Sequence, residues 1–237
     1  MALRNSYARS KVTKWRRWPR VRLKVDEADY RAVLARHGRR EVYHWTPAAQ
    51  LPSVLTHGIL CRRELERRGI VYDPHSYGAT GKETDFEGHV CVSFYPHKGM
   101  MKQATGPPAI IVMSSMVVAA QGAFYCPENT AKNDYEFAEI SSHVGVEDLD
   151  KLFVDPNAWD LVDWQAEVWI PDSIAVGEIG RVLFRSAEER DAAVVACAPI
   201  AAGLPRDIRF VVGTWQFPAP APTPPALAVE DLPEWLR

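Results

Sequence analysis

Residues 41–58 read EVYHWTPAAQLPSVLTHG and decide the fold class. Their first part, EVYHWT, is rich in aromatic and β-branched residues, which is typical of a strand. Thr46 and Pro47 then supply the residue types of a helix N-cap and a first helical position, so we expect a helix to begin there. Apolar residues recur at helical spacing up to Gly58, which is an end signal. The segment therefore predicts a strand that runs directly into a short helix.

The segments on either side of this unit predict two more short helices. Residues 25–40 carry apolar residues on one face and cations at their C-terminal end. Residues 61–68 (CRRELERR) place Glu64 and Arg68 at i, i+4, a spacing that favours an ion pair on a helix.

The rest of the chain predicts mostly strands. Strands are expected at 89–96 and 107–114, which are rich in β-branched residues, and also at the start of 122–136 and at 164–171, 178–185 and 208–217. A helix is expected at 186–198, where Ser186 and Glu189 form the pattern of a capping box. Helices early and many short strands later favour an α+β domain with antiparallel pairing over a doubly wound parallel sheet. Neither a GxGxxG nor a GxxxxGK[ST] phosphate-binding pattern is present.

The composition is that of a soluble globular protein. Of 237 residues, 47% are hydrophobic and 24% are charged. The four cysteines form no CxxC pair, so neither a disulfide framework nor a cysteine-based zinc site is expected. No apolar run is long enough to span a membrane, and the basic N-terminus lacks the apolar core of a secretory signal. We expect a cytoplasmic protein without a membrane contact.

Charge is distributed very unevenly. The first 24 residues contain nine Lys or Arg and no acid, whereas the other 213 residues carry a net charge of −11. Trp15 and Trp18 are interleaved with the cations, and cations with flat rings suit a nucleic acid. The alternative is a solvated tail or an edge strand whose tryptophans pack on the body.

Two positions have the residue types of a catalytic site. His44 lies where the first strand meets the helix, and Gln165 and Glu167 share one face of the strand at 164–171. A carboxylate on an apolar strand must be exposed or line a cleft, because burying it unpaired is costly. Each position also has an ordinary explanation: a structural histidine, and a half-exposed strand.

Four stretches of this sequence resemble, in the same order, motifs of the DarT-type DNA ADP-ribosyltransferases, and the guanine-directed branch more than the thymine-directed one. The stretches are YHWTPAAQLPSVLTHGILCRRELERRGI (43–70), VSFYPHKGMM (92–101), GAFYCPENTAKN (122–133) and QAEVWIPDSIAVGEI (165–179). The resemblance covers most of residues 43–185, roughly three fifths of the chain.

The resemblance implies an ADP-ribosyltransferase fold of class α+β, with two packed, mostly antiparallel sheets, an NAD cleft and peripheral helices. It implies transfer of ADP-ribose from NAD⁺ to a base of single-stranded DNA, with release of nicotinamide and without a metal. Guanine is favoured over thymine. It also implies a toxin of a toxin–antitoxin or phage-defence system, with a macrodomain-type antitoxin as partner. We expect a monomer with a basic arm and short helix at 1–40, the transferase domain at 41–217, and an extended or disordered Pro/Ala-rich tail at 218–237.

The resemblance also assigns cofactor-binding residues. His44 corresponds to the histidine that holds a ribose of NAD⁺, and Trp45 and Thr46 line the nicotinamide pocket through their backbone. Ser53 and Leu60 lie near the cofactor.

Glu167 corresponds to the catalytic glutamate. It binds the 2′-hydroxyl of the nicotinamide ribose and stabilises the oxocarbenium-like transition state. Gln165 lies beside it, at the cofactor and the acceptor base. We expect His44 and Glu167 to lie on adjacent strands of a split sheet and to line one pocket.

Nucleic-acid contacts are expected from two segments. They are Asn129 and Lys132 of the GAFYCPENTAKN motif, and Arg16 and Arg17 of the basic arm.

One catalytic feature of the family is missing here. The family has an arginine in the loop before the VSFYP-like strand, whereas residues 69–97 contain none. Three explanations stay open: Lys82 takes its place, an arginine such as Arg67 or Arg68 reaches in from the preceding helix, or the acceptor differs. Lysine is the poorer bidentate phosphate ligand.

Other functions stay open as alternatives. An RNA-directed ADP-ribosyltransferase or an NAD-dependent RNA 2′-phosphotransferase would share the fold and the basic arm. A phosphotransferase needs several arginines around a phosphate, which the gap at 69–97 disfavours. A non-enzymatic nucleic-acid-binding module would have no need for His44 and Glu167 in one cleft.

Overall fold

The structure is a computed structural model. It describes residues 21–72, 86–96, 106–127, 130, 137–153, 166–204 and 208–213.

Within these ranges the strands are β1 (Glu41–Pro47), β2 (Ile59–Leu60), β3 (His89–Ser93), β4 (Pro108–Ser114), β5 (Phe124–Cys126), β6 (Glu167–Pro171), β7 (Ser173–Ile174), β8 (Ile179–Phe184) and β9 (Arg209–Val212). The α-helices are α1 (Glu27–Arg36), α2 (Leu51–His57), α3 (Arg62–Arg67), α5 (Phe137–Ile140), α6 (Val146–Asp150) and α7 (Ala187–Ala201). Short 3₁₀ turns are η1 (Ala48–Gln50), η4 (Ser115–Ala119) and η5 (Val176–Glu178).

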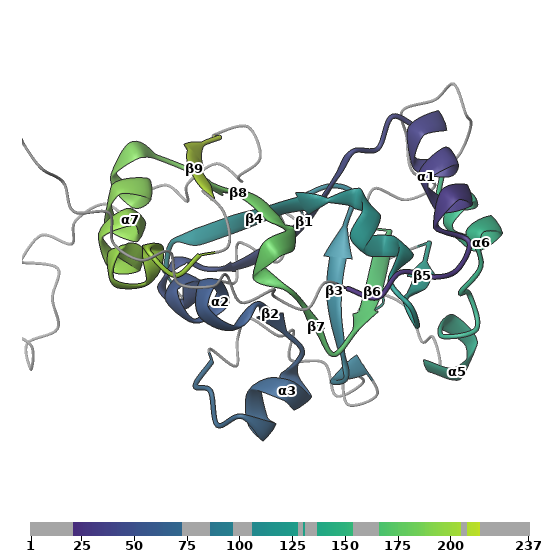
Figure 1. Ribbon diagram of the computed structural model, residues 1–237, viewed down its shortest axis with the longest axis horizontal. Coiled ribbons are helices and arrows are strands. Elements are labelled where there is room, and N and C mark those ends of the chain that lie inside the picture. Colours follow the sequence, from purple (N-terminus) through teal and green to yellow (C-terminus); the bar gives the residue numbers. More distant parts are fainter. Residues whose placement is uncertain are drawn as a thin grey trace, which may run out of the picture.

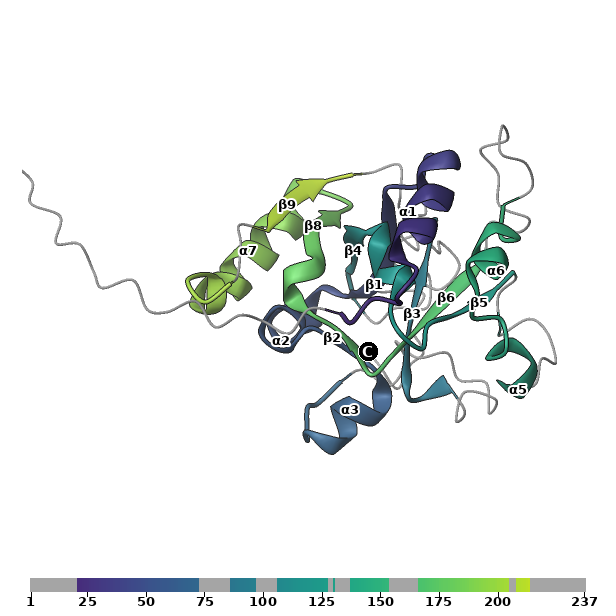
Figure 2. The same cartoon turned by 45° about the vertical axis from the view of Figure 1, so that its right-hand side comes forward.

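A seven-stranded sheet with the order β5-β6-β3-β1-β4-β8-β9 forms the centre of the fold. Its neighbours are antiparallel except β8 and β9, which are parallel. A second sheet consists of β2 and β7. In Figures 1 and 2, α7 lies beside β8 and β9, and α1, α5 and α6 lie at the opposite end near β5. The predicted α+β class and mostly antiparallel pairing are confirmed, although the two sheets are very unequal in size.

The large sheet is almost divided between β1 and β3. Strand β1 pairs with β4 along its whole length, from Glu41↔Ser114 to Pro47↔Pro108. With β3 it shares one register pair, Tyr43↔Ser93. Figure 1 shows the result: β3 and β6 run across the direction of β1 and β4. We call β1, β4, β8 and β9 the first half-sheet and β5, β6 and β3 the second half-sheet.

The core covers both faces of the central strand. The side chains of β4 alternate between the main core, which contains Ile111 and Met113, and a smaller cluster formed by Ile110, Val112 and Leu183. The second half-sheet contributes to the main core as well, through residues such as Val92 and Val168. Packing therefore joins the half-sheets where backbone pairing does not.

The predicted start of the helix after β1 is wrong. Thr46 and Pro47 stay in the strand because they pair with Ala109 and Pro108 of β4. Helix α2 begins at Leu51, one 3₁₀ turn later, with Pro52 in its first turn. The predicted end is right, since Gly58 terminates α2 with a φ of +87°.

The other helix predictions are confirmed with small shifts. Helix α1 buries Tyr30, Val33 and Leu34 on one face, and in α3 the Arg68–Glu64 pair measures 3.0 Å. Helix α7 runs from Ala187 to Ala201, past the predicted end at 198, with Pro199 in its last turns.

The capping box expected at the start of α7 is half formed. The Ser186 hydroxyl accepts from the backbone N–H of Glu189 at 3.2 Å. The Glu189 carboxylate accepts instead from the backbone N–H of Arg185.

Residues 21–24 of the basic segment pack on the body. Leu23 forms a β-bridge with Ala120, and the backbone N–H of Lys24 donates to the Ala119 carbonyl at 2.9 Å. The Lys24 ammonium donates to the hydroxyls of Tyr30 and Tyr125 and to the carbonyls of Ala123 and Val144. Burial lowers the pKa of Lys24 to about 8. This end of the segment is therefore a structural element, whereas residues 1–20 lie outside the described ranges.

No helix in the described part of the chain is both long and apolar enough to cross a membrane.

Candidate active site

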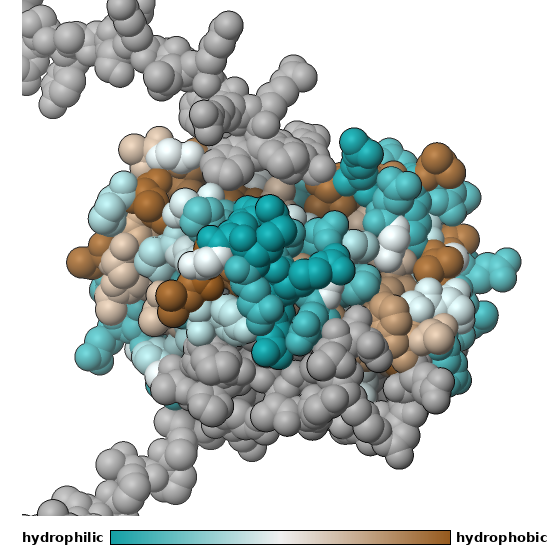
Figure 3. Space-filling model, turned by 90° about the horizontal axis from the view of Figure 1, so that it is seen from below, coloured by the Kyte–Doolittle hydropathy of each residue, from teal (hydrophilic) through white to brown (hydrophobic). Residues whose placement is uncertain are grey.

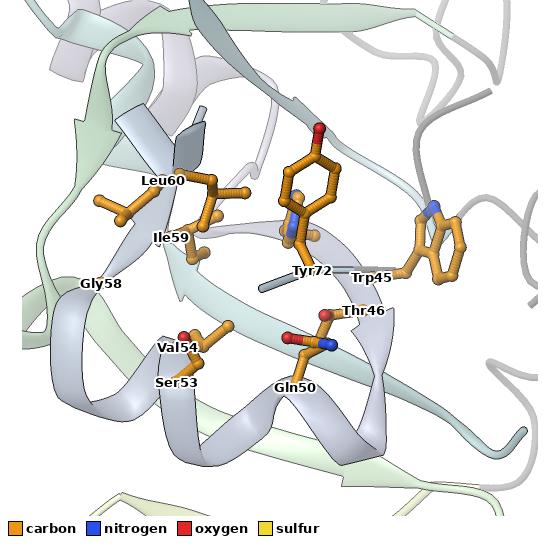
Figure 4. Close-up of a pocket in the computed structure, with 11 residues that line it drawn as sticks. Trp45, Thr46, Gln50, Ser53, Val54, Gly58, Ile59, Leu60 and Tyr72 are labelled. Carbon is orange, nitrogen blue, oxygen red and sulfur yellow. The ribbon is translucent and has the colours of Figure 1, made fainter. Parts of the chain in front are cut away.

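A pocket opens beside the C-terminal part of β1 (Figure 4). It is lined by residues of β1, η1, α2, β2, α3 and the segment after α3: His44, Trp45, Thr46, Gln50, Ser53, Val54, Gly58, Ile59, Leu60, Leu65 and Tyr72. These residues include five of the six positions expected to bind the cofactor. The sixth, Gln165, lies outside the described residues.

The alternation of side chains along β1 gives its three pocket residues different roles. His44 and Thr46 point to one side of the strand, and Trp45 points to the other. The Trp45 ring packs against the cluster around Ile110, and Figure 4 shows the indole directed away from the other labelled side chains. Trp45 therefore presents its backbone to the pocket.

His44 is held in one orientation by a backbone carbonyl of β3. Its Nδ1 lies 2.9 Å from the Cys91 oxygen, and because a carbonyl only accepts, Nδ1 carries the proton. Burial lowers the pKa of His44, so the ring is neutral near pH 7 and Nε2 is an acceptor. A neutral imidazole with Nε2 as acceptor suits a ligand hydroxyl such as that of a ribose.

The turn after α2 brings the helix and β2 together at the pocket. A Cβ on Gly58 would lie 2.4 Å from the Ile174 carbonyl oxygen, so the β7 backbone approaches closely here. Strand β2 then pairs with β7 through Ile59↔Ile174 and Leu60↔Ser173. This pairing fixes Leu60 at the pocket, while α2 presents Ser53 from the facing side.

Tyr72 is fixed by two side chains of α3. Its hydroxyl donates to Glu66 Oε1 at 2.9 Å and accepts from Arg62 Nε at 3.0 Å. The Tyr72 ring therefore lines the pocket from a segment that α3 holds in place.

The arginines of α3 form ion pairs with carboxylates. Arg67 and Arg68 both contact Glu64, and Arg63 contacts Asp172. Figure 3 shows the hydrophilic side chains that gather around this part of the surface. Arg67 and Arg68, one of the three alternatives for the family's arginine, pair with Glu64 on the surface of the helix. Arg62 contacts a pocket residue, Tyr72, and also pairs with Glu66 and Glu87.

Glu167 lies at the start of β6, between its partners Ser93 of β3 and Cys126 of β5. Glu167 is 3% exposed. Both the backbone N–H and the hydroxyl of Thr130 donate to Oε2, at 3.1 and 2.9 Å. Burial nevertheless raises the pKa of Glu167 to about 7, against the lowering effect of these bonds.

The structure corrects the expected arrangement of His44 and Glu167. They are not on adjacent strands, because β3 lies between β1 and β6. The lining of the described pocket contains His44 but not Glu167. Cys91 of β3 connects the two, since its carbonyl accepts from His44 and its thiol side lies toward Glu167, where it lowers the pKa of that carboxyl.

Several predicted residues are not described by the structure. They are the proposed catalytic Lys82, Gln165, and the four nucleic-acid contacts Asn129, Lys132, Arg16 and Arg17.

Sequence reasoning missed Gln50, Tyr72 and Thr130. Thr130 lies inside a quoted motif, GAFYCPENTAKN, so a signal for it was present. Gln50 also lies inside a quoted motif, the stretch 43–70, whereas Tyr72 lies just beyond it and the sequence offers no local pattern for it.

A metal site is not found among the described residues: no three His, Cys, Asp or Glu side chains there are grouped to hold an ion.

Solved structures of DarT proteins are similar to this one. DarTG of Thermosipho africanus, in complex with ADP-ribose, has a TM-score of 0.52 over 74% of this chain and 50% of its own, at 17% identity. DarT of Thermus sp. 2.9, in complex with NAD⁺, has a TM-score of 0.51 over 76% of this chain and 98% of its own, at 14% identity. The chain thus spans half the length of the Thermosipho protein. No protein-family model and no curated protein sequence matches it.

An almost divided mixed sheet, a small second sheet and a pocket beside the first strand accompany this similarity. The chain therefore has the ADP-ribosyltransferase fold of the DarT proteins.

Proposed function

We propose that this protein is an NAD-dependent ADP-ribosyltransferase that modifies a base of single-stranded DNA. The observation that carries the proposal is the pocket, which gathers His44, Trp45, Thr46, Ser53 and Leu60 in a fold whose solved examples bind NAD⁺ and ADP-ribose. The resemblance to the DarT-type enzymes assigns the same five residues to NAD⁺.

The chain supplies groups that bind NAD⁺ and a group that stabilises the transition state. In the pocket, the acceptor Nε2 of His44 receives a ribose hydroxyl, and Thr46 with the Trp45 backbone faces the nicotinamide. Glu167 acts as the carboxylate that meets the 2′-hydroxyl of the nicotinamide ribose. Its negative charge stabilises the cationic sugar carbon as the bond from C1′ to the nicotinamide nitrogen breaks.

The bond changes are those of a substitution at C1′. Nicotinamide leaves with the electron pair of the broken bond, which neutralises its ring. A lone pair on the acceptor base forms the new bond to C1′, and a base proton is released to solvent. On the resemblance to the guanine-directed branch, we assign guanine as the preferred acceptor.

The remaining assignments are part of the same proposal. Lys82 takes the place of the family's arginine, Gln165 helps to orient the acceptor base, and Asn129, Lys132, Arg16 and Arg17 contact the DNA. The biological role proposed is that of a toxin paired with a macrodomain antitoxin. The pairing of the α3 arginines with carboxylates disfavours a 2′-phosphotransferase, which needs such groups around a phosphate.

Mass spectrometry of oligonucleotides tests the proposal. Single-stranded DNA with one guanine or one thymine in a fixed context is incubated with the protein and NAD⁺, and matched RNA is run in parallel. We expect the guanine DNA to gain the mass of one ADP-ribose and an equal amount of nicotinamide to appear. Modification of RNA alone would move the assignment to an RNA-directed enzyme, and binding without NAD⁺ consumption would indicate a non-enzymatic module.

A further inference from the structure

Thr130 makes two hydrogen bonds to one oxygen of the buried Glu167 side chain. Its backbone N–H and its hydroxyl both donate to Oε2, and neither bond uses Oε1. Thr130 belongs to no helix or strand, and this contact fixes it to Glu167 at the start of β6.

We propose that Thr130 is a positioning residue that holds Glu167 by Oε2 and leaves Oε1 to meet the ribose 2′-hydroxyl. The proposal rests on the proposed function, in which Glu167 is the catalytic carboxylate. It adds a residue from outside the pocket to the catalytic machinery.

The groups that surround Glu167 determine how much the two hydrogen bonds from Thr130 matter for its ionisation. Strand β3 presents Ser93 and the Cys91 thiol on the same face, β5 presents Cys126, and β6 presents Trp169. The Ser93 hydroxyl donates to the Tyr95 carbonyl, so its proton is engaged elsewhere. His89 lies farther along that face, against Phe124 and Phe137, and burial lowers its pKa.

None of the groups that these described strands present to Glu167 is a lysine or an arginine. Among the described residues, hydrogen-bond donors on Thr130, Trp169 and Cys91 favour the charged form of the Glu167 carboxyl, against its burial. Thr130 contributes two such donors, one of which is the hydroxyl that a substitution can remove while the backbone bond stays.

Removing the hydroxyl gives a shift that a purely structural role would not cause. Thr130→Val keeps the shape of the side chain and leaves the backbone N–H in place. Loss of a hydrogen bond to the charged form should raise the pKa of Glu167 by about one unit. At pH 7 the ionised fraction, and with it the rate of NAD⁺ cleavage, then falls several-fold, and the loss is recovered at higher pH.

Carbon-13 NMR on the full chain measures this directly. Protein labelled at the glutamate δ-carbon is titrated, and the Glu167 signal is identified by its absence in Glu167→Gln. We compare wild type with Thr130→Val, with Thr130→Ser, and with Thr56→Val. Thr56 is a matched control, because its hydroxyl donates to the Pro52 carbonyl on the exposed side of α2.

The expected midpoint for wild type is near 7. Thr130→Val should titrate about one pH unit higher, whereas Thr130→Ser and Thr56→Val should match wild type. The acid limb of NAD⁺ hydrolysis should move by the same amount. An unchanged midpoint in folded Thr130→Val would overturn the proposal, as would a loss of hydrolysis at every pH that Thr130→Ser does not restore.

The two readouts separate this proposal from the function on which it rests. If wild type consumes no NAD⁺ at any pH, the proposed function fails, and the titration still decides whether Thr130 controls the ionisation of Glu167.

Discussion

The two half-sheets build their parts of the site in opposite ways. On the first half-sheet, the pocket comes from one continuous segment, His44 to Tyr72, whose strand, helices and turns follow each other along the chain. On the second half-sheet, one carboxylate is enclosed by residues distant in sequence: Ser93, Cys126 and Thr130. One region is a local scaffold with an open surface, and the other is a buried charge that depends on long-range pairing.

This difference separates binding from chemistry. The pocket offers neutral groups, such as the His44 imidazole and the Ser53 hydroxyl, which hold a ligand without a large electrostatic cost. Glu167 carries the charge, and its burial makes that charge costly in the ground state. We therefore expect changes in the two regions to affect different measurements.

The largest effect is expected from Glu167→Gln. The substitution keeps the size of the side chain and removes the charge that meets the oxocarbenium-like centre. Transfer to DNA should fall by about 10²–10³-fold, whereas NAD⁺ affinity, measured by calorimetry, should stay close to that of wild type. Glu139→Gln on the exposed side of α5 is the matched control. If Glu167→Gln lowers NAD⁺ affinity as much as it lowers the rate of transfer, binding and chemistry are not divided between the two regions.

The next effect is on how stability depends on pH. Because the folded pKa of Glu167, about 7, lies above its usual value of 4.5, the folded state holds a proton that the unfolded state has lost. Wild type therefore loses stability as pH rises from about 4.5 to 7, by at most about 3 kcal/mol. In Glu167→Gln this contribution is absent.

Urea unfolding at pH 4.5 and pH 8 checks this. The difference in unfolding free energy, variant minus wild type, should become more positive by up to about 3 kcal/mol at the higher pH. A difference that stays constant across this range would show that Glu167 is not held in a desolvated site.

A smaller loss of stability is expected from Gly58→Ala at the pocket. The new Cβ would be forced against the Ile174 carbonyl in addition to the strain of a positive φ, so unfolding free energy should fall by about 2–3 kcal/mol. Gly38→Ala shares the positive φ but meets no atom within 4 Å, and should cost about 1 kcal/mol. Because β2 would shift with Gly58, NAD⁺ affinity should fall only in Gly58→Ala. Equal costs for the two variants would mean that β2 and β7 do not fix the pocket.

The smallest effect concerns Lys24, which lies outside both parts of the site. Lys24→Met keeps the aliphatic stem and removes the donors to two tyrosine hydroxyls and two carbonyls, so we expect a loss of about 1–2 kcal/mol in thermal or urea unfolding. Arg22→Met, two residues earlier and exposed, should change stability by less than about 0.5 kcal/mol. NAD⁺ affinity should be unchanged in both. If Arg22→Met costs as much as Lys24→Met, the buried ammonium contributes nothing specific.

The sequence predicted the local features well. The helix with buried Tyr30, Val33 and Leu34, the Gly58 stop and the Ser186 cap all follow from interactions within a few residues. The motif at 43–70 contained most of the pocket residues, because the pocket is formed by one continuous segment of the chain.

The errors have a common physical cause. The Thr46-Pro47 signal for a helix start was overridden by seven register pairs with β4. The neighbours of Glu167 depend on the position of β3 between β1 and β6 in the sheet. The hydrogen bond from Thr130 to Glu167 Oε2 joins residues 37 positions apart. Such long-range pairings leave no periodic trace in the sequence.

The line between β1 and β3 has the least backbone pairing of the large sheet, so a bend between the half-sheets is expected there before elsewhere. A bend between the half-sheets needs the loss of very little backbone pairing there: the Tyr43↔Ser93 contact and the bond from His44 to the Cys91 carbonyl. The pocket lies beside the first half-sheet and Glu167 lies on the second. Such a bend would therefore change the distance between a bound ligand and Glu167 without unfolding either half-sheet. Amide hydrogen exchange should then be faster where β1 meets β3 than within β4. Bound NAD⁺, which would contact both half-sheets, should slow the exchange.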